Sequence, residues 1–135
     1  MSALDTSVAV PSLLAWHEHH GVCADAASGA SIPSHALLET YSVITRLPAP
    51  HRVRGTDADR LLGSRFAAEH ILVTSAALQR SLVRRLVVLG IEGGAVYDAL
   101  VGLTAKHHGE PLLTRDARAA RTYELLGVPY ELVRS

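Results

Sequence analysis

Short apolar runs alternate along the chain with longer segments in which apolar residues recur every three or four positions. The runs are typical of buried strands, and the periodic segments are typical of amphipathic helices. Strands are expected at residues 2–4, 31–32, 70–74, 111–114 and 130–133. Helices are expected at residues 7–16, 35–47, 56–68, 76–89, 95–108 and 117–126. Because the two kinds of segment alternate from end to end, the sequence predicts an α/β fold.

Turn and cap residues set several of these boundaries. Thr6 or Ser7 is expected to cap the first helix. Pro48 ends the helix at 35–47, and Gly90 ends the helix at 76–89. Residues 24–34 are small and turn-rich, and a turn region around the short second strand is expected there. Trp16, at the end of the first expected helix, is predicted to be buried beneath that helix.

The length of 135 residues fits one domain, 1–135, and the sequence contains no repeats or linkers. Cys23 is the only cysteine, so no intramolecular disulfide is possible and a cytoplasmic location is the default. The apolar run at 8–16 is interrupted by Pro11 and is too short to span a bilayer. We therefore expect neither a signal peptide nor a membrane partner.

The overall charge is balanced, with 13 Lys and Arg against 13 Asp and Glu, so it neither requires nor excludes a nucleic-acid partner. Twelve of the 13 basic residues are Arg, whose planar guanidinium suits phosphate groups. Codon bias explains this excess equally well. Charge and composition therefore leave the function open.

Four acidic residues stand where a solvated surface charge is not expected. Asp5 and Asp116 directly follow expected strands, whereas Glu39 and Asp98 interrupt the apolar patterns of expected helices. In an open parallel sheet, a crevice lies beyond the carboxyl ends of the strands, where acids far apart in the sequence converge. Clustered carboxylates raise one another's pKa unless a cation holds them, and Mg²⁺ or Mn²⁺ suits all-oxygen ligands. The pattern predicts a metal-dependent enzyme that cleaves phosphate bonds.

Each acid also has a purely structural explanation. Asp5 and Asp116 are placed to cap the helices that follow them. Glu39 and Asp98 are placed as first-turn acids that interact favourably with a helix dipole. On its expected helix, Asp98 shares a side with Gly102, which leaves room for the close approach of another element. Four such acids at the entrances of separate elements are a less probable coincidence than any one of them.

Hydroxyl and guanidinium groups accompany the acids. Thr6, Ser7 and Thr114 are placed beside the acids, where their hydroxyls can orient a carboxylate, a water or a phosphate oxygen. Three arginines are candidates for binding substrate phosphates: Arg46, Arg115 and Arg118. The arginines of the expected loop at residues 51–54 are further candidates. Arg46 lies on the same side of its helix as Glu39, so a solvated ion pair explains it equally well.

The sequence resembles the PIN-domain ribonucleases, and most closely the VapC-type toxins of bacterial toxin–antitoxin pairs. The resemblance is carried by residues 4–8, 32–35, 38–40, 45–48, 93–99, 113–116 and 126–128. It implies a three-layer α/β/α sandwich with a mostly parallel central sheet. It also implies that Asp5, Asp98 and Asp116 hold the metal and that Glu39 completes the acidic pocket.

The same resemblance implies an endoribonuclease that hydrolyses RNA with Mg²⁺ or Mn²⁺, forms a homodimer and is inhibited by a small cognate antitoxin protein. Two alternatives stay open. A metal-dependent phosphatase would also use an Asp after the first strand, although its usual second Asp is replaced here by Ser7. A non-catalytic module that binds nucleic acid or protein on the same fold would leave the four acids unexplained.

Overall fold

A parallel five-stranded arrangement forms the centre of the computed structural model, which describes residues 1–134. The strands are β1 (Ala3–Leu4), β2 (Ile32–Pro33), β3 (Ile71–Leu72), β4 (Leu112–Thr114) and β5 (Tyr130–Leu132). β4 pairs with β1 on one side and with β5 on the other, and β2 pairs with β3. A parallel bridge between Ala3 and Ser31 joins the two groups. The strand order is therefore β3-β2-β1-β4-β5.

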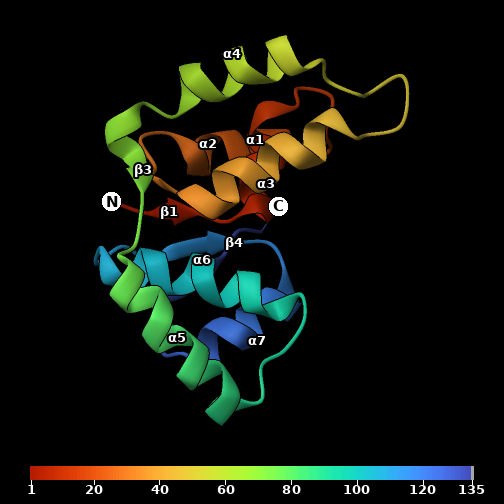
Figure 1. Ribbon diagram of the computed structural model, residues 1–135. Helices are drawn as coiled ribbons and strands as arrows, with labels where there is room; N and C mark the ends of the chain where they lie inside the picture. The colour runs from red at the N-terminus through yellow and green to blue at the C-terminus, as the bar shows by residue number, and fades with distance from the viewer. Residues whose placement is uncertain (135) are drawn as a thin grey trace.

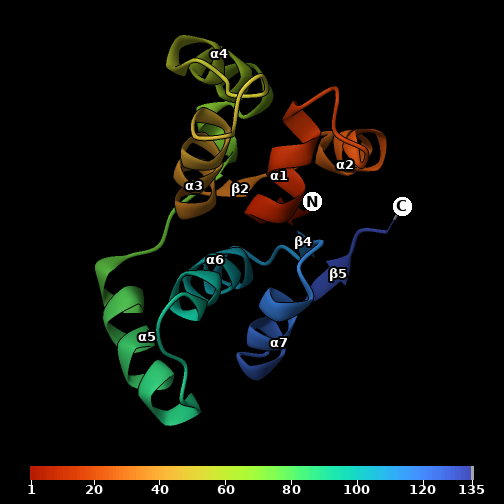
Figure 2. The ribbon, with the colours of Figure 1, turned by 90° about the vertical axis from the view of Figure 1, so that its right-hand side faces the viewer.

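Helices cover both faces of these strands (Figures 1 and 2). One side carries α1 (Thr6–Leu13), α2 (His20–Ala27), α3 (Ser34–Thr45) and α4 (Gly55–Arg65). The other side carries α5 (Ala76–Leu89), α6 (Ala95–His107) and α7 (Ala117–Leu125). A 3₁₀ turn at Ala68–His70 precedes β3. The prediction of an α/β fold is confirmed, and the helices and strands form three layers.

The strands are short, and β1, β2 and β4 are fully buried, whereas the edge strand β5 is partly exposed. Leu4, Ile32 and Leu112 are completely buried in the core. Burial on both faces explains why the strands appear in the sequence as continuous apolar runs and not as an alternating pattern. From β1 the sheet continues to β2 and β3 on one side, and from β4 it continues to β5 on the other. Because β1 and β4 are neighbours and parallel, the elements that follow these two strands start from neighbouring points at one edge of the sheet.

The first helix differs from its prediction at both ends. Its N-cap is Asp5, whose side chain accepts a hydrogen bond from the Ser7 backbone, and not Thr6 or Ser7 as expected. The helix ends at Leu13, so Trp16 lies beyond it. The Trp16 side chain is 51% exposed and stacks on His51 at 4.0 Å between ring centroids. The prediction that Trp16 is buried is therefore wrong, because another exposed loop ring, and not the core, covers part of it.

Two further elements depart from the sequence pattern. α2 lies partly within the expected turn region, and it has no side-chain N-cap bond. Its helical state depends on burial of Cys23 and Ala27 in the core, a tertiary contribution that local propensity does not contain. The strand expected at 70–74 contains only Ile71 and Leu72, because the chain leaves the sheet at Val73, which is 60% exposed.

The other helices follow their predicted bounds within a few residues. α5 begins at a Ser75 N-cap and ends at Gly90, which adopts the left-handed conformation that favours glycine. The search for membrane-spanning helices found none within residues 1–134 that is long and apolar enough to cross a bilayer.

Candidate active site

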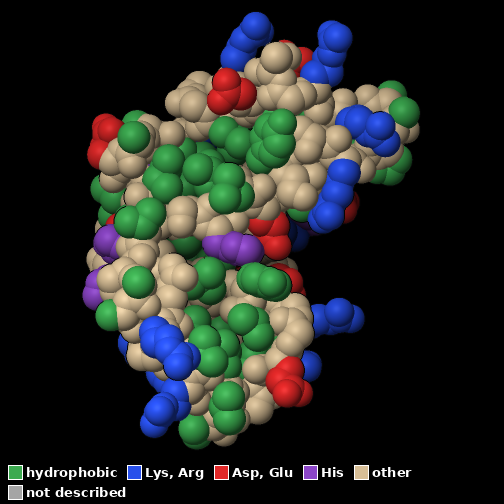
Figure 3. All heavy atoms as spheres, viewed as in Figure 1, with side chains coloured by type: hydrophobic (Ala, Val, Ile, Leu, Met, Phe, Trp, Pro, Cys, Tyr) green, Lys and Arg blue, Asp and Glu red, His purple; other side chains and the backbone are tan. Residues whose placement is uncertain are grey.

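The four acids singled out in the sequence line one cavity. Asp5 follows β1, and Asp116 follows β4, the strand that pairs with β1. Glu39 comes from α3 and Asp98 from α6. The cavity has a volume of about 50 Å³ and is also lined by Thr6, Ser7, Val101 and Tyr123. In Figure 3, acidic side chains lie at the hollow between the α1–α4 side of the molecule and the α5–α7 side.

Asp5 is held in one orientation by three hydrogen bonds. Its Oδ1 accepts from the Ser7 backbone N–H at 3.0 Å and from the Ser7 hydroxyl at 2.6 Å. Its Oδ2 accepts from the Tyr123 hydroxyl at 2.8 Å. Burial raises the pKa of Asp5, and the hydrogen bonds oppose this rise. The result is a buried carboxylate with a fixed direction, in which Oδ2 keeps one lone pair for a further ligand.

Asp116 is an N-cap as well as a wall of the cavity. Its Oδ1 accepts hydrogen bonds from the backbone N–H groups of Arg118 at 2.9 Å and Ala119 at 3.3 Å. Thr114 Oγ1 accepts from the Asp116 backbone N–H at 3.1 Å. Among the described residues, Asp116 Oδ2 has no hydrogen-bond donor. The capping explanation is therefore correct for Asp116, and it leaves one carboxylate oxygen available to a ligand.

Asp98 shows most directly that the acids act on one another. It lies in the first turn of α6 and is half-buried. Burial, followed by the negative charges of Asp116, Asp5 and Glu39, raises the pKa of Asp98 to about 6. None of the described residues that line the cavity is Lys or Arg. The cavity therefore concentrates negative charge that no protein cation there compensates.

Of the two cavity acids that lie within helices, Glu39 is exposed and Asp98 is half-buried. Glu39 Oε1 accepts a hydrogen bond from the Thr6 hydroxyl, which connects α3 to the start of α1. Glu39 lies beyond the first turn of α3, which contains no acid. The explanation of Glu39 as a first-turn acid is therefore wrong. Its position is explained instead by its contact with Thr6 at the cavity.

The donor set fits a hard divalent cation. No group of three or more His, Cys, Asp or Glu side chains within residues 1–134 stands ready to hold a metal ion. Mg²⁺, however, commonly binds through one or two carboxylates and keeps several waters. The cavity is large enough for water, and its lining offers carboxylate and hydroxyl oxygens. Asp98, Asp116 and Glu39 retain carboxylate oxygens that have no hydrogen-bond donor among the described residues, and Asp5 is fixed beside them.

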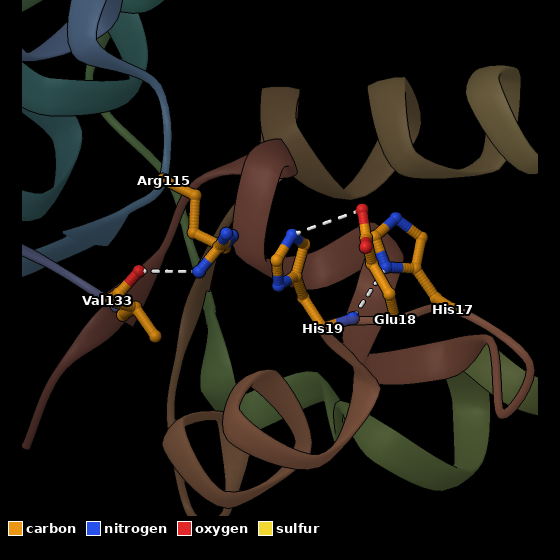
Figure 4. A network of polar contacts seen from close by, with 5 residues as sticks. All are labelled: His17, Glu18, His19, Arg115 and Val133. Carbon is orange, nitrogen blue, oxygen red and sulfur yellow. Dashed lines mark hydrogen bonds and ion pairs between the residues drawn. The ribbon is translucent and has the colours of Figure 1, made fainter. Parts of the chain in front are cut away.

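The three candidate arginines lie outside the cavity lining. The Arg115 backbone N–H donates to Ser7 Oγ at 2.7 Å, but its side chain leaves the site and donates to the Val133 carbonyl at 2.7 Å. Figure 4 shows the Arg115 guanidinium pointing towards Val133 and His19, beside the loop of His17 and Glu18. Arg46, the C-cap of α3, and Arg118, in α7, are exposed.

Sequence reasoning missed Tyr123 as a site residue. Its side chain is completely buried, and a Cβ added at Gly102 would lie 2.7 Å from Tyr123 Cδ1. Gly102 therefore allows the ring to approach α6 and to reach Asp5. The signal in the sequence was the small residue on the Asp98 side of that helix, but nothing in the pattern identified the aromatic partner. Ser7, noted there as a hydroxyl beside the acids, connects both strand ends: its Oγ lies 3.3 Å from Thr114 Oγ1.

Comparison with protein families and curated proteins gives consistent matches. A model described as the PIN domain matches residues 3–125. Ribonuclease VapC40 of Mycobacterium tuberculosis is 46% identical over 134 residues, which cover 98% of this chain and 99% of that protein. Ribonuclease VapC27 of the same organism is 50% identical over 128 residues, covering 93% of this chain and 92% of that protein.

Solved structures support the fold. VapC20 of Mycobacterium tuberculosis, described as a toxin that cleaves the sarcin–ricin loop, aligns with a TM-score of 0.67 at 18% identity, covering 90% of this chain and 94% of that chain. VapBC2 of Rickettsia felis, bound to a DNA fragment from its promoter, aligns with a TM-score of 0.67 at 16% identity, covering 97% of each chain. At these identities the likeness concerns the fold alone.

Proposed function

The chain belongs to the PIN-domain family, and from this premise we propose that it is a metal-dependent endoribonuclease, the toxin of a bacterial toxin–antitoxin pair. The observation that carries the proposal is the cavity into which four separate elements bring Asp5, Glu39, Asp98 and Asp116. The two VapC relatives, each about half identical over nearly its whole length, carry the name ribonuclease. The reaction proposed is hydrolysis of RNA phosphodiester bonds.

Bound Mg²⁺ or Mn²⁺ would supply polarisation of a phosphoryl oxygen and a nucleophilic hydroxide from water. Asp5, Asp98 and Asp116 are the residues that would hold the ion. Ser7 and Tyr123 keep the Asp5 carboxylate in one direction, so little reorganisation is needed when the site is loaded. The α7 N-terminus does the same for Asp116.

Glu39 and Thr6 have a different part in the proposal. Glu39 is exposed at the cavity, and the Thr6 hydroxyl donates to it. A carboxylate in this position accepts a proton from an attacking water and orients that water towards the phosphate. Thr114 supports Asp116, because the Thr114 hydroxyl oxygen accepts a hydrogen bond from the Asp116 backbone N–H. Arg46 and Arg118 are proposed to bind RNA phosphates outside the cavity. Arg115 could bind a phosphate only after its hydrogen bond to the Val133 carbonyl is broken.

The partners proposed are RNA, a second copy of the chain and a small antitoxin protein in the cytoplasm. The fold neighbours include VapC20, described as a toxin, and VapBC2, bound to a DNA fragment from its promoter. An antitoxin would inhibit by covering the acidic cavity, and a basic side chain inserted there would neutralise charges that no cationic lining residue compensates.

The proposal is tested by incubating the purified chain with labelled RNA in the presence of Mg²⁺, Mn²⁺ or EDTA, beside the Asp98→Asn variant. Cleavage by the wild type with either metal, abolished by EDTA and greatly reduced in Asp98→Asn, is the expected result. Asp59→Asn, a change at an exposed acid of α4, is the matched control and should cleave normally.

An Asp98→Asn variant as active as the wild type would contradict the site assignment. RNA binding without cleavage under every metal condition would instead favour the non-catalytic binding module. Hydrolysis of a phosphomonoester without cleavage of RNA would favour the phosphatase.

A further inference from the structure

Two aromatic rings stack at the rim of the acidic cavity. His35 of α3 and Tyr97 of α6 lie with their ring centroids 5.0 Å apart and their planes at 3°. His35 precedes Glu39 by one helical turn and therefore lies on the same side of α3. Tyr97 is the direct neighbour of Asp98 in α6. The stack therefore joins the two helices that carry Glu39 and Asp98.

The pair is fixed and still accessible. Tyr97 is 53% exposed, and His35 is partly exposed. In the described part of the chain, neither the Tyr97 hydroxyl nor the His35 ring nitrogens have a hydrogen-bond partner. A ring that is already held in place by its neighbour loses little conformational freedom when it binds a ligand. Both a flat surface and free polar edges are thus presented beside the cavity.

The charge of the cavity makes such a surface useful. The acids repel an RNA phosphate, and none of the described cavity-lining residues is Lys or Arg. Stacking between a nucleobase and an aromatic ring carries no net charge, so nearby carboxylates weaken it little. Proteins that bind single-stranded RNA commonly use such stacking, which tolerates any base because every base has a flat face.

We propose that the His35–Tyr97 stack is a base-binding platform that holds one nucleobase of single-stranded RNA next to the phosphate to be cleaved. This proposal rests on the proposed ribonuclease function and names its substrate class. His35 positions the Tyr97 ring, and Tyr97 contacts the base. The platform would bind the RNA at the rim of the cavity, where the acids repel the RNA phosphates.

The first test measures binding without cleavage. The probe is a short single-stranded RNA that carries a fluorescent purine analogue, mixed with chain in which Asp116→Asn prevents cleavage. Stacking should quench the fluorescence on binding. Adding Tyr97→Ala should weaken binding by about 5- to 150-fold and remove the quenching, as expected for loss of one base–aromatic stack. Tyr97→Phe keeps the ring and should bind like its parent.

The second test separates a platform from a mere structural contact between α3 and α6. In the otherwise wild-type chain, Tyr97→Ala should raise KM for RNA while kcat stays nearly unchanged. The same variant should cleave RNA that lacks a base beside the mapped cut site no worse than the wild type does. Val87→Ala, at an exposed position of α5, is the control and should change neither value.

The outcomes distinguish this inference from the proposed function. Equal losses on intact and abasic RNA, together with a lower Tm for Tyr97→Ala, would overturn the platform and assign the stack a structural role. Unchanged KM and unchanged quenching in Tyr97→Ala would overturn it as well. If the wild type cleaves no RNA but the fluorescent probe is still quenched by Tyr97, the ribonuclease proposal fails, and base binding by the stack stands without a part in cleavage.

Discussion

The Tyr123 hydroxyl, on the last helix, donates a 2.8 Å hydrogen bond to the Asp5 carboxylate at the end of the first strand. Tyr123 is completely buried, and its ring packs where Gly102 of α6 leaves space. Desolvation, followed by the nearby charge of Asp5, raises the pKa of Tyr123, so the phenol stays protonated and remains a donor. One of the proposed metal-holding acids is thus oriented by a residue 118 positions away in the sequence.

Tyr123→Phe should lower activity while leaving the fold intact. The change removes one of the hydrogen bonds that keep the Asp5 pKa from rising further, so that pKa should move up. We expect roughly tenfold slower cleavage, a rate profile displaced towards higher pH, and a loss of about 1 kcal/mol in the free energy of unfolding. Tyr130→Phe removes the hydroxyl that donates to Glu124 outside the cavity, and serves as the control. Identical pH–rate profiles for Tyr123→Phe and wild type would contradict this role.

Gly102→Ala should disturb the same contact from the other side. The added Cβ would lie 2.7 Å from Tyr123 Cδ1 and 3.3 Å from Val128 Cγ2, so the ring must move. Overpacking of this kind costs about 1–3 kcal/mol of folding stability, and the displaced hydroxyl should also reduce cleavage. Gly63→Ala in α4 meets no atom within 4 Å and should stabilise by about 0.5–1 kcal/mol through helix propensity. Chemical denaturation of both variants tests the pair, and a neutral Gly102→Ala would show that the ring is not held against α6.

The four acids that line the cavity could be singled out in the sequence because each follows or interrupts a strong apolar pattern. Asp5 comes directly after β1, and Asp116 comes two residues after the end of β4. Both strands are buried on both faces, and such strands produce unbroken apolar runs. Asp98 was recognisable because it stands in the first turn of a helix that is otherwise almost entirely apolar. The structure also shows that the capping explanations of Asp5 and Asp116 are correct, and that the same two residues line the cavity.

The features that the sequence could not supply depend on partners that are distant in the chain. Burial of Cys23 and Ala27 accompanies α2, whose sequence has no periodic stripe. The Tyr123 contact with Asp5 connects opposite ends of the chain. Arg115 follows a site residue closely, yet its side chain turns towards Val133. In each case the deciding interaction is tertiary, and local pattern does not contain it.

Asp98→Asn should make the metal-free chain more stable at neutral pH. In the folded chain the pKa of Asp98 is about 6, above its ordinary value of 3.8. The folded state therefore binds this proton more tightly, and stability contributed by protonated Asp98 is lost as pH rises from about 4 to about 6. Because Asp98 is half-buried, solvent screening should limit the effect to about 1 kcal/mol.

The measurement is urea denaturation in EDTA across that pH range. The Asn variant should show a shallower loss of stability than the wild type and should exceed it above about pH 6. Some slope should remain, because burial also raises the pKa of Asp5. Added Mg²⁺ should stabilise the wild type more than the variant, since only ligands that bind the folded state stabilise it. Parallel curves for the two proteins in EDTA would contradict repulsion at Asp98.

Substitutions at Asp116 should separate its capping role from its proposed metal role. Asp116 Oδ1 caps α7 through the N–H groups of Arg118 and Ala119. Asn is as good an N-cap as Asp, so Asp116→Asn should keep the stability within a few tenths of a kcal/mol. Asp116→Ala loses the cap and should cost about 0.5–2 kcal/mol. Both variants lack the carboxylate charge, and both should lose most metal-dependent cleavage. If Asp116→Asn cleaves RNA normally and only Asp116→Ala loses activity, Asp116 has a structural role alone. The reason is that Asp116→Asn keeps the helix cap but lacks the carboxylate charge.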